Sequence, residues 1–149
     1  MKAKTTWIVV ADEKAVRVFQ TIGFGKGFDE RKGSYPAAEP VPDRELVSDK
    51  PGRAFDSRGF GRHAMEFRTS PKRTEEKKFA RKIAEWLIDE DRRHHFDRLA
   101  IIAPPKLLGD LRREIPGGLN SKVFREVAKD FVNESSAKIA KHFDQLGLV

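Results

Sequence analysis

The sequence predicts an α/β fold in which a mixed β-sheet is covered by helices, within a single domain of 149 residues. Two observations carry this prediction. The segments TTWIVVAD and RLAIIAPP are apolar at consecutive positions, as is typical of strands covered on both faces. The first is followed after a short polar connection by another strand pattern, whereas helical patterns flank the second. An antiparallel hairpin followed by alternating helices and strands forms a mixed sheet.

The N-terminal hairpin is expected to turn at the polar residues 12–14. In the returning strand, AVRVFQTI, apolar and polar residues alternate with an interruption at Phe19: Val16, Val18 and Ile22 fall on one face, Arg17 and Thr21 on the other. Residues 23–33 read as a turn and loop. A third strand is expected nearby, although the pattern does not place it.

A long amphipathic helix is predicted from residue 71 to about residue 93. Ser70 is a typical N-cap, and proline is favoured at the first helical position. Apolar residues then recur at helical spacing, namely Phe79, Ala80, Ile83, Ala84, Trp86 and Leu87.

The C-terminal third is predicted to alternate helices with one further strand. KLLGDLRREI forms a short helix that ends before residues 116–118, and GGLN reads as a turn. KVFREVAKDFV fits a helix and a strand equally well. SSAKIAKHFDQLG predicts a last helix that Gly147 stops and whose apolar stripe is Ile139, Ala140, Phe143 and Leu146.

Charge and cysteine content restrict the function. The formal net charge is +7 and the isoelectric point about 9.8, which favours an anionic partner such as RNA, DNA, the ribosome or an acidic membrane surface. The alternative is a basic protein without such a partner. Cysteine is absent, which excludes disulfides, zinc–thiolate sites and thiol nucleophiles. The apolar run at residues 7–11 is too short for a signal peptide, so a cytoplasmic location is expected.

Residues 35–70 are rich in proline and glycine, lack apolar periodicity, and are expected to form a mobile, functional loop. From Lys50 to Arg73 there are seven cations and two anions, an excess of five. Arginine suits bidentate phosphate contacts, and interleaved phenylalanines can stack on unpaired bases. The residues expected to bind RNA are Arg53, Phe55, Arg58, Phe60, Arg62 and Arg68.

Other residues of this segment are expected to order the loop. Aspartates can pair with arginines or cap turns, and glycines let the backbone approach a ligand closely. These residues are Asp43, Asp49, Gly52, Asp56, Gly59 and Gly61. The alternative is that the arginines only keep the loop soluble while its phenylalanines pack on the core.

Enzyme signatures are weak. GFGKG lacks the downstream pattern of a phosphate loop, and no histidine spacing matches a metal site. The adjacent His94 and His95 read as a solvated helix end. His63 and Glu66 are the acid/base candidates, and no metal or cofactor is predicted. The element order also suits ribonuclease-H-like nucleases, but no carboxylate lies in the middle of a strand, where a two-metal site usually begins.

Several segments resemble the bacterial family of host attachment proteins. They are TTWIVVAD, DRELVSDKPGRAFDS, GRHAMEFRTSPKRTEEKKFARKIAEWL and FDRLAIIAPPKLLGDLR, which together extend over nearly the whole chain. The most specific are residues 43–57 and FDRLAIIAPP. That family in turn resembles the middle domain of archaeal and eukaryotic peptide-chain release factors, which has a ribonuclease-H-like α/β fold.

The release-factor resemblance implies a role on the ribosome, in translation or ribosome rescue. The catalytic Gly-Gly-Gln loop of those domains lies between the early strands and the first long helix, where residues 48–73 lie in this chain. The resemblance also implies a strand at residues 123–129. No glutamine occurs between Lys50 and Arg73, so the hydrolysis of peptidyl-tRNA is not carried over.

Overall fold

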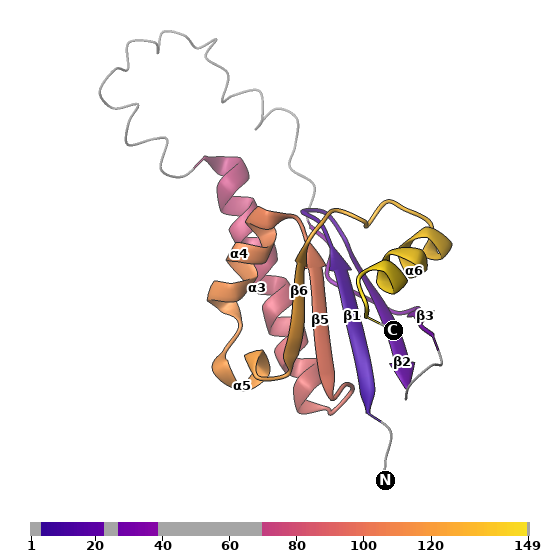
Figure 1. The fold of residues 1–149 in the computed structure, drawn as a ribbon. Helices are drawn as coiled ribbons and strands as arrows, with labels where there is room; N and C mark the ends of the chain where they lie inside the picture. Colours follow the sequence, from indigo (N-terminus) through magenta and orange to yellow (C-terminus); the bar gives the residue numbers. More distant parts are fainter. Residues whose placement is uncertain (1–3, 23–26, 39–69, 149) are drawn as a thin grey trace, which may run out of the picture.

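The computed structural model describes residues 4–22, 27–38 and 70–148, which form a five-stranded mixed sheet with helices on both faces (Figure 1). Its elements in chain order are β1 (Thr5–Ala11), β2 (Val16–Ile22), β3 (Asp29–Arg31), α3 (Pro71–Arg92), β5 (Arg98–Ala103), α4 (Pro105–Glu114), α5 (Gly117–Asn120), β6 (Val123–Ala128) and α6 (Ser136–Gln145). The strand order is β3-β2-β1-β5-β6. The first three strands pair antiparallel, whereas β1–β5 and β5–β6 pair parallel. The predicted mixed α/β fold is confirmed.

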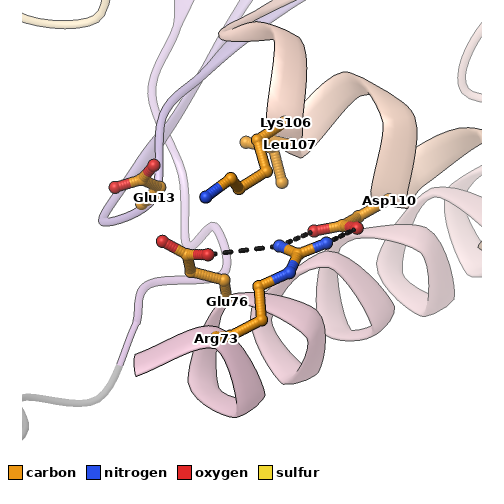
Figure 2. Close-up of a pocket in the computed structure, with 6 residues that line it drawn as sticks. All are labelled: Glu13, Arg73, Glu76, Lys106, Leu107 and Asp110. Atoms are coloured by element: carbon orange, nitrogen blue, oxygen red, sulfur yellow. Dashed lines mark hydrogen bonds and ion pairs between the residues drawn. The ribbon is translucent and has the colours of Figure 1, made fainter. Parts of the chain in front are cut away.

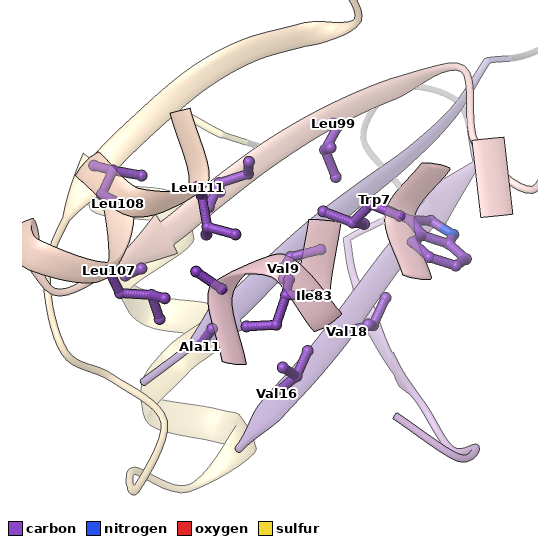
Figure 3. Packing of buried hydrophobic residues seen from close by; sticks show 14 of the residues in the cluster. Trp7, Val9, Ala11, Val16, Val18, Ile83, Leu99, Leu107, Leu108 and Leu111 are labelled. Atoms are coloured by element: carbon purple, nitrogen blue, oxygen red, sulfur yellow. The ribbon is translucent and has the colours of Figure 1, made fainter. Parts of the chain in front are cut away.

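Two apolar clusters lie on opposite faces of the sheet. Trp7, Val9 and Ala11 of β1 pack against the apolar side of α3 and α4 (Figure 3), whereas Ile8 and Val10 pack under α6. β5 alternates in the same way, because Leu99 and Ile101 join the first cluster and Ala100 and Ile102 the second. A strand covered on both faces needs apolar residues at consecutive positions. The prediction for TTWIVVAD and RLAIIAPP is therefore confirmed.

The apparent interruption at Phe19 is a consequence of the second layer. Val16 and Val18 belong to the cluster under α3, whereas Phe19 points to the other face and contacts Phe143 of α6 edge to face, with ring centroids 5.2 Å apart. The guanidinium of Arg17 lies 5.4 Å from the Phe19 ring centroid. β2 thus keeps a strict period of two, and Phe19 is apolar because this face of the sheet is also covered.

Three details of the prediction need correction. The segment 23–33 was expected to be turn and loop, but Asp29–Arg31 forms β3, which pairs with β2 and is the third strand that was expected nearby without being placed. Gly117–Asn120 forms the short helix α5 instead of a turn, with Leu119 buried in the core. Ala140 is exposed on α6, because only Ile139 and Phe143 of that helix are buried. The strand expected from family resemblance at 123–129 is confirmed as β6.

The ends of the predicted loop are ordered in part. Tyr35 packs edge to face on Trp86 and donates its hydroxyl to the carbonyl of Arg31, and the Ala38 amide donates to the carbonyl of Lys14. Residues 35–38 are therefore packed against the folded domain. Residues 39–69 lie outside the described part of the chain.

Helix boundaries follow the predicted signals. Ser70 accepts a hydrogen bond from the Arg73 amide at 3.0 Å, so it is the N-cap of α3. Gly147 has a φ of +71°, a left-handed value that favours glycine, and it follows the end of α6. His94 and His95 lie beyond α3 rather than on it, and both are exposed, as expected for a solvated helix end.

A single arginine joins β2 to β3 and to the chain that enters α6. Arg17 donates to both carboxylate oxygens of Glu30, at 2.8 and 2.7 Å, and to the carbonyls of Val132 and Glu134. Its Nη2 also donates to the Ser136 hydroxyl. The hydrogen bond from Arg17 is the main reason why the pKa of Glu30 is lowered from its usual 4.5. The three-residue β3 is thereby held in the sheet by side chains as well as by its backbone.

We predict that Glu30→Gln lowers the free energy of unfolding by about 1 kcal/mol at pH 7, since the pair is partly exposed to solvent. A lowered pKa in the folded state means that this stability is present above pH 4.5 and is lost as the pH falls through the lowered value. Urea denaturation between pH 7 and pH 3 should therefore show the two proteins converging at low pH. The exposed Glu85 of α3 provides the control, and Glu85→Gln should show no such convergence.

Candidate functional site

The two described segments that flank residues 39–69 contact the rest of the fold at one end of the sheet, where β1 and β5 have their carboxyl ends. On the N-terminal side, Ala38 is hydrogen-bonded to Lys14 in the turn between β1 and β2. On the C-terminal side, Ser70 begins α3, whose first turns line a pocket with Glu13 of the same turn. Figure 1 shows that α3 starts at the end of the sheet where β1 and β5 have their carboxyl ends. We call these described residues at the carboxyl ends of β1 and β5 the root: Glu13, Lys14, Ala38, Ser70, Arg73, Glu76, Lys106 and Asp110.

A buried ion pair fixes the start of α3 against α4 (Figure 2). Arg73 donates to both oxygens of Asp110, at 2.7 and 2.5 Å, and also to Glu76 at 3.1 Å. Arg113 donates a further hydrogen bond to Asp110 at 3.0 Å. Asp110 is only 4% exposed, so its charge requires these partners. The hydrogen bond to Asp110 is the main cause of the raised pKa of Arg73, which therefore stays charged.

The pocket at the root is small and carries both signs of charge. Lys106 of α4 extends toward Glu13 and Glu76 (Figure 2), while Leu107 closes the pocket on the α4 side. The pocket is partly open to solvent and has an internal volume of about 0 Å³, far below the roughly 300 Å³ at the lower end of organic-ligand pockets. The pocket is therefore better suited to fixing α3 against α4 and the β1–β2 turn than to holding a small organic substrate.

The carboxylates that follow β1 and end α3 are not brought together, as a two-metal site would require. Asp12 accepts the amide hydrogen bonds of Lys14 and Ala15, at 2.8 and 2.9 Å, and so shapes the β1–β2 turn. Asp91 pairs with Lys122, just before β6 at the other end of the sheet. Within residues 4–22, 27–38 and 70–148, no group of three or more histidine, aspartate or glutamate side chains could hold a metal ion. Contrary to the expectation from sequence, two carboxylates do lie in the interior of strands, Glu30 in β3 and Glu126 in β6, but each pairs with an arginine.

All the site residues predicted from sequence fall outside the described part of the chain. They are the RNA-contact candidates Arg53, Phe55, Arg58, Phe60, Arg62 and Arg68, the ordering residues Asp43, Asp49, Gly52, Asp56, Gly59 and Gly61, and the acid/base candidates His63 and Glu66. Their roles stay predictions. The excess of five positive charges counted from Lys50 to Arg73 does not belong to residues 39–69 alone. Two of its seven cations, Lys72 and Arg73, lie in α3, and Arg73 is neutralised by Asp110. Residues 39–69 alone contain six cations and six anions.

The sequence analysis did not predict two side-chain pairs, one made by Asp110 and the other by His142. Asp110 could have been found, because it falls next to Leu111 and three residues after Leu107 on the apolar side of its helix, where a carboxylate needs a partner. His142 gave no such signal. Its Nε2 lies 2.9 Å from Glu134, and its ring stacks on Phe131 with centroids 3.8 Å apart. Contact between residues eight positions apart depends on the turn that precedes α6.

Comparison with known proteins identifies a family whose model covers most of the chain and a relative that covers about half of it. The sequence model of a family described as "Protein required for attachment to host cells" matches residues 7–143. The uncharacterised protein RP470 of Rickettsia prowazekii (strain Madrid E) is 38% identical over 73 residues, which are 48% of this chain. That match spans about half the length of the relative, 49%. Among the described residues, no helix combines the length and apolar character needed to cross a bilayer.

We predict that Asp110→Asn lowers the free energy of unfolding by about 2–4 kcal/mol, because it leaves Arg73 without its bidentate acceptor. Urea denaturation at pH 7 measures the loss. Glu114→Gln is the matched control, since its partner Arg81 is largely exposed and surface pairs contribute little. Equal stability of the two variants would contradict a structural role for the buried pair.

Proposed function

We propose that this chain, which belongs to the family of proteins required for attachment to host cells, is an RNA- or ribosome-associated domain. The proposed contact is the basic part of the segment, residues 50–68, with five cations and two anions. The net charge of +7 favours a polyanionic partner, and the interleaved arginines and phenylalanines suit phosphate contact and base stacking.

The observation that supports this proposal most is the place of the segment in the fold. Its two flanks are anchored at the same end of the sheet. The Ala38–Lys14 hydrogen bond holds the N-terminal flank, and the Ser70 cap holds the C-terminal flank. The Arg73–Asp110 pair immobilises the helix that follows. A rigid scaffold that holds both ends of a connecting segment is a common arrangement for binding loops.

We also propose that the domain is related to the middle domain of peptide-chain release factors and is ribonuclease-H-like. An antiparallel meander of three strands followed by parallel strands, in the order β3-β2-β1-β5-β6, is consistent with this relationship. In those factors the functional loop precedes the first long helix, and residues 39–69 precede α3. The missing Gly-Gly-Gln tip favours contact with RNA without hydrolysis of peptidyl-tRNA. Such a partner implies action in the cytoplasm, which we include in the proposal.

A second candidate function is a protein-interaction domain that regulates surface attachment, and the description of the family favours it. This candidate predicts that pull-downs recover the same protein partners after nuclease treatment. The hydrolase alternative depends on His63 and Glu66, and no described residue adds to it. RNA association predicts instead that recovery of partners is lost with nuclease.

The proposal predicts a salt-sensitive association with tRNA and ribosomal RNA. Changing Arg53, Arg58, Arg62 and Arg68 to Ser should weaken binding and reduce the slope of log K against log salt by roughly three. A filter-binding titration between 50 and 300 mM salt measures both quantities (the salt range is about that in which phosphate contacts are lost).

The matched control changes four exposed cations elsewhere, Lys77, Arg92, Lys138 and Lys141, to Ser. It removes the same formal charge and should retain most of the affinity. Equal behaviour of the two variants would show that the contact is not specific to the segment. Sedimentation of cell lysate then tests whether the protein travels with ribosomes and leaves them at high salt.

A further inference from the structure

A cationic and aromatic patch lies on the sheet at the amino ends of β5 and β6, away from the root. Phe124 of the edge strand β6 is 39% exposed, and within the described ranges it is the one large apolar side chain classed as exposed. The guanidinium of Arg98 lies 4.4 Å from the centroid of its ring. We call Arg98, Phe124 and Arg125 the β6 patch.

A β-bulge explains why these side chains gather. Leu99 pairs with Val123, but Ala100 pairs with Arg125, so Phe124 is an additional residue in β6. The bulge shifts the alternation: Val123 packs in the cluster under α3, whereas Val127 packs in the cluster under α6. Arg125, in register with Ala100, therefore faces the α6 side, as does Arg98 two residues before Ala100. Bulges commonly redirect side chains near binding sites.

Both arginines donate hydrogen bonds to neutral acceptors. Arg98 donates to the Thr6 hydroxyl at 3.2 Å, and Arg125 donates to the carbonyl of Leu146 at 3.0 Å. Neither forms an ion pair with a carboxylate of residues 4–22, 27–38 or 70–148, in contrast to Arg17, Arg73, Arg81, Arg93, Arg112 and Arg113. The nearby Asp97 accepts the Thr5 amide, and Glu126 on the other face pairs with Arg112. The patch thus keeps two oriented positive charges beside an exposed ring.

Pairing of β6 with a second copy of the chain is the main alternative occupant. An added strand would need a continuous ladder of backbone hydrogen bonds, and a bulge in an edge strand disrupts such a ladder. Two cations in or beside this short strand, Arg125 and Lys129, also repel an identical strand. The observations therefore favour an anionic partner that brings its own flat ring.

We infer that the β6 patch binds an unpaired nucleotide of single-stranded RNA. The base extends the stack formed by Arg98 and Phe124, and Arg125 meets the adjoining phosphate. Preorganised side chains lower the cost of ordering on binding. This inference rests on the proposed RNA association and adds a second contact, which lies at the end of the sheet opposite to the root.

The test uses the full chain, a labelled 15-nucleotide oligouridine and an RNA duplex of the same length, followed by fluorescence anisotropy. Phe124→Ala should weaken oligouridine binding at least about fivefold and leave duplex binding unchanged, because only unpaired bases can stack. Phe124→Trp should retain binding, and its emission should be quenched by oligouridine. Arg125→Ser should lower the salt slope by about one, the effect of one phosphate contact. Arg112→Ser, which changes an arginine on the opposite face, is the control and should bind oligouridine as the unaltered protein does.

The outcomes separate this inference from the proposed function. If the unaltered protein binds RNA and both Phe124 variants bind oligouridine equally well without quenching, the patch is not a stacking site, although RNA association stands. Absence of any RNA binding by the unaltered protein overturns both. If sedimentation velocity shows a dimer that Phe124→Ala converts to a monomer, with RNA binding unaffected, the patch is a self-association surface and the inference is wrong.

Discussion

The constraint on which the rest of the structure depends is the burial of β1 and β5 on both faces. Every side chain from Thr6 to Ala11 is buried, and β5 is buried from Leu99 onward. Two adjacent strands of this kind need a helical layer on each side, which α3 and α4 provide on one face and α6 on the other. The chain moves outward through β2 and β3 and must then return across the sheet to add β5. Residues 39–69 and α3 lie in that long crossover.

Two bidentate ion pairs of the domain join elements that are far apart in the sequence. Arg17 and Glu30 join β3 and the α6 entry to β2, and Arg73 and Asp110 join α3 to α4. Each of these arginines uses its planar fork on a carboxylate from a different element, a geometry that lysine does not reproduce. A basic composition therefore does not mean a uniformly basic surface, because many guanidinium groups are occupied by the protein itself. Arg98 and Arg125 of the β6 patch have neutral hydrogen-bond acceptors among the described residues.

Family membership and geometry bear on different parts of the function. The match to host attachment proteins covers nearly all of the fold, including both flanks of the segment. The description of that family names a cellular phenotype. The fold, in contrast, presents two surfaces with defined charged and aromatic side chains. The root holds both flanks of residues 39–69, a segment whose sequence is acidic in its first part and basic in its second, and the β6 patch presents an exposed aromatic ring stacked on Arg98, next to Arg125 in the sequence. An RNA partner would use both surfaces through the same two interactions, phosphate pairing and stacking.

The sequence by itself determined the elements whose signal is local. Consecutive apolar residues predicted β1 and β5, helical spacing and the Ser70–Pro71 pair predicted α3, and Gly147 predicted the end of α6. Tertiary structure alone decided what depends on distant partners. β3 exists because β2 offers it an edge, and KVFREVAKDFV becomes a strand because β5 is there to pair with it. The pairing of Arg73 with Asp110 and the exposure of Phe124 likewise depend on packing between elements far apart in the chain, which local periodicity does not contain.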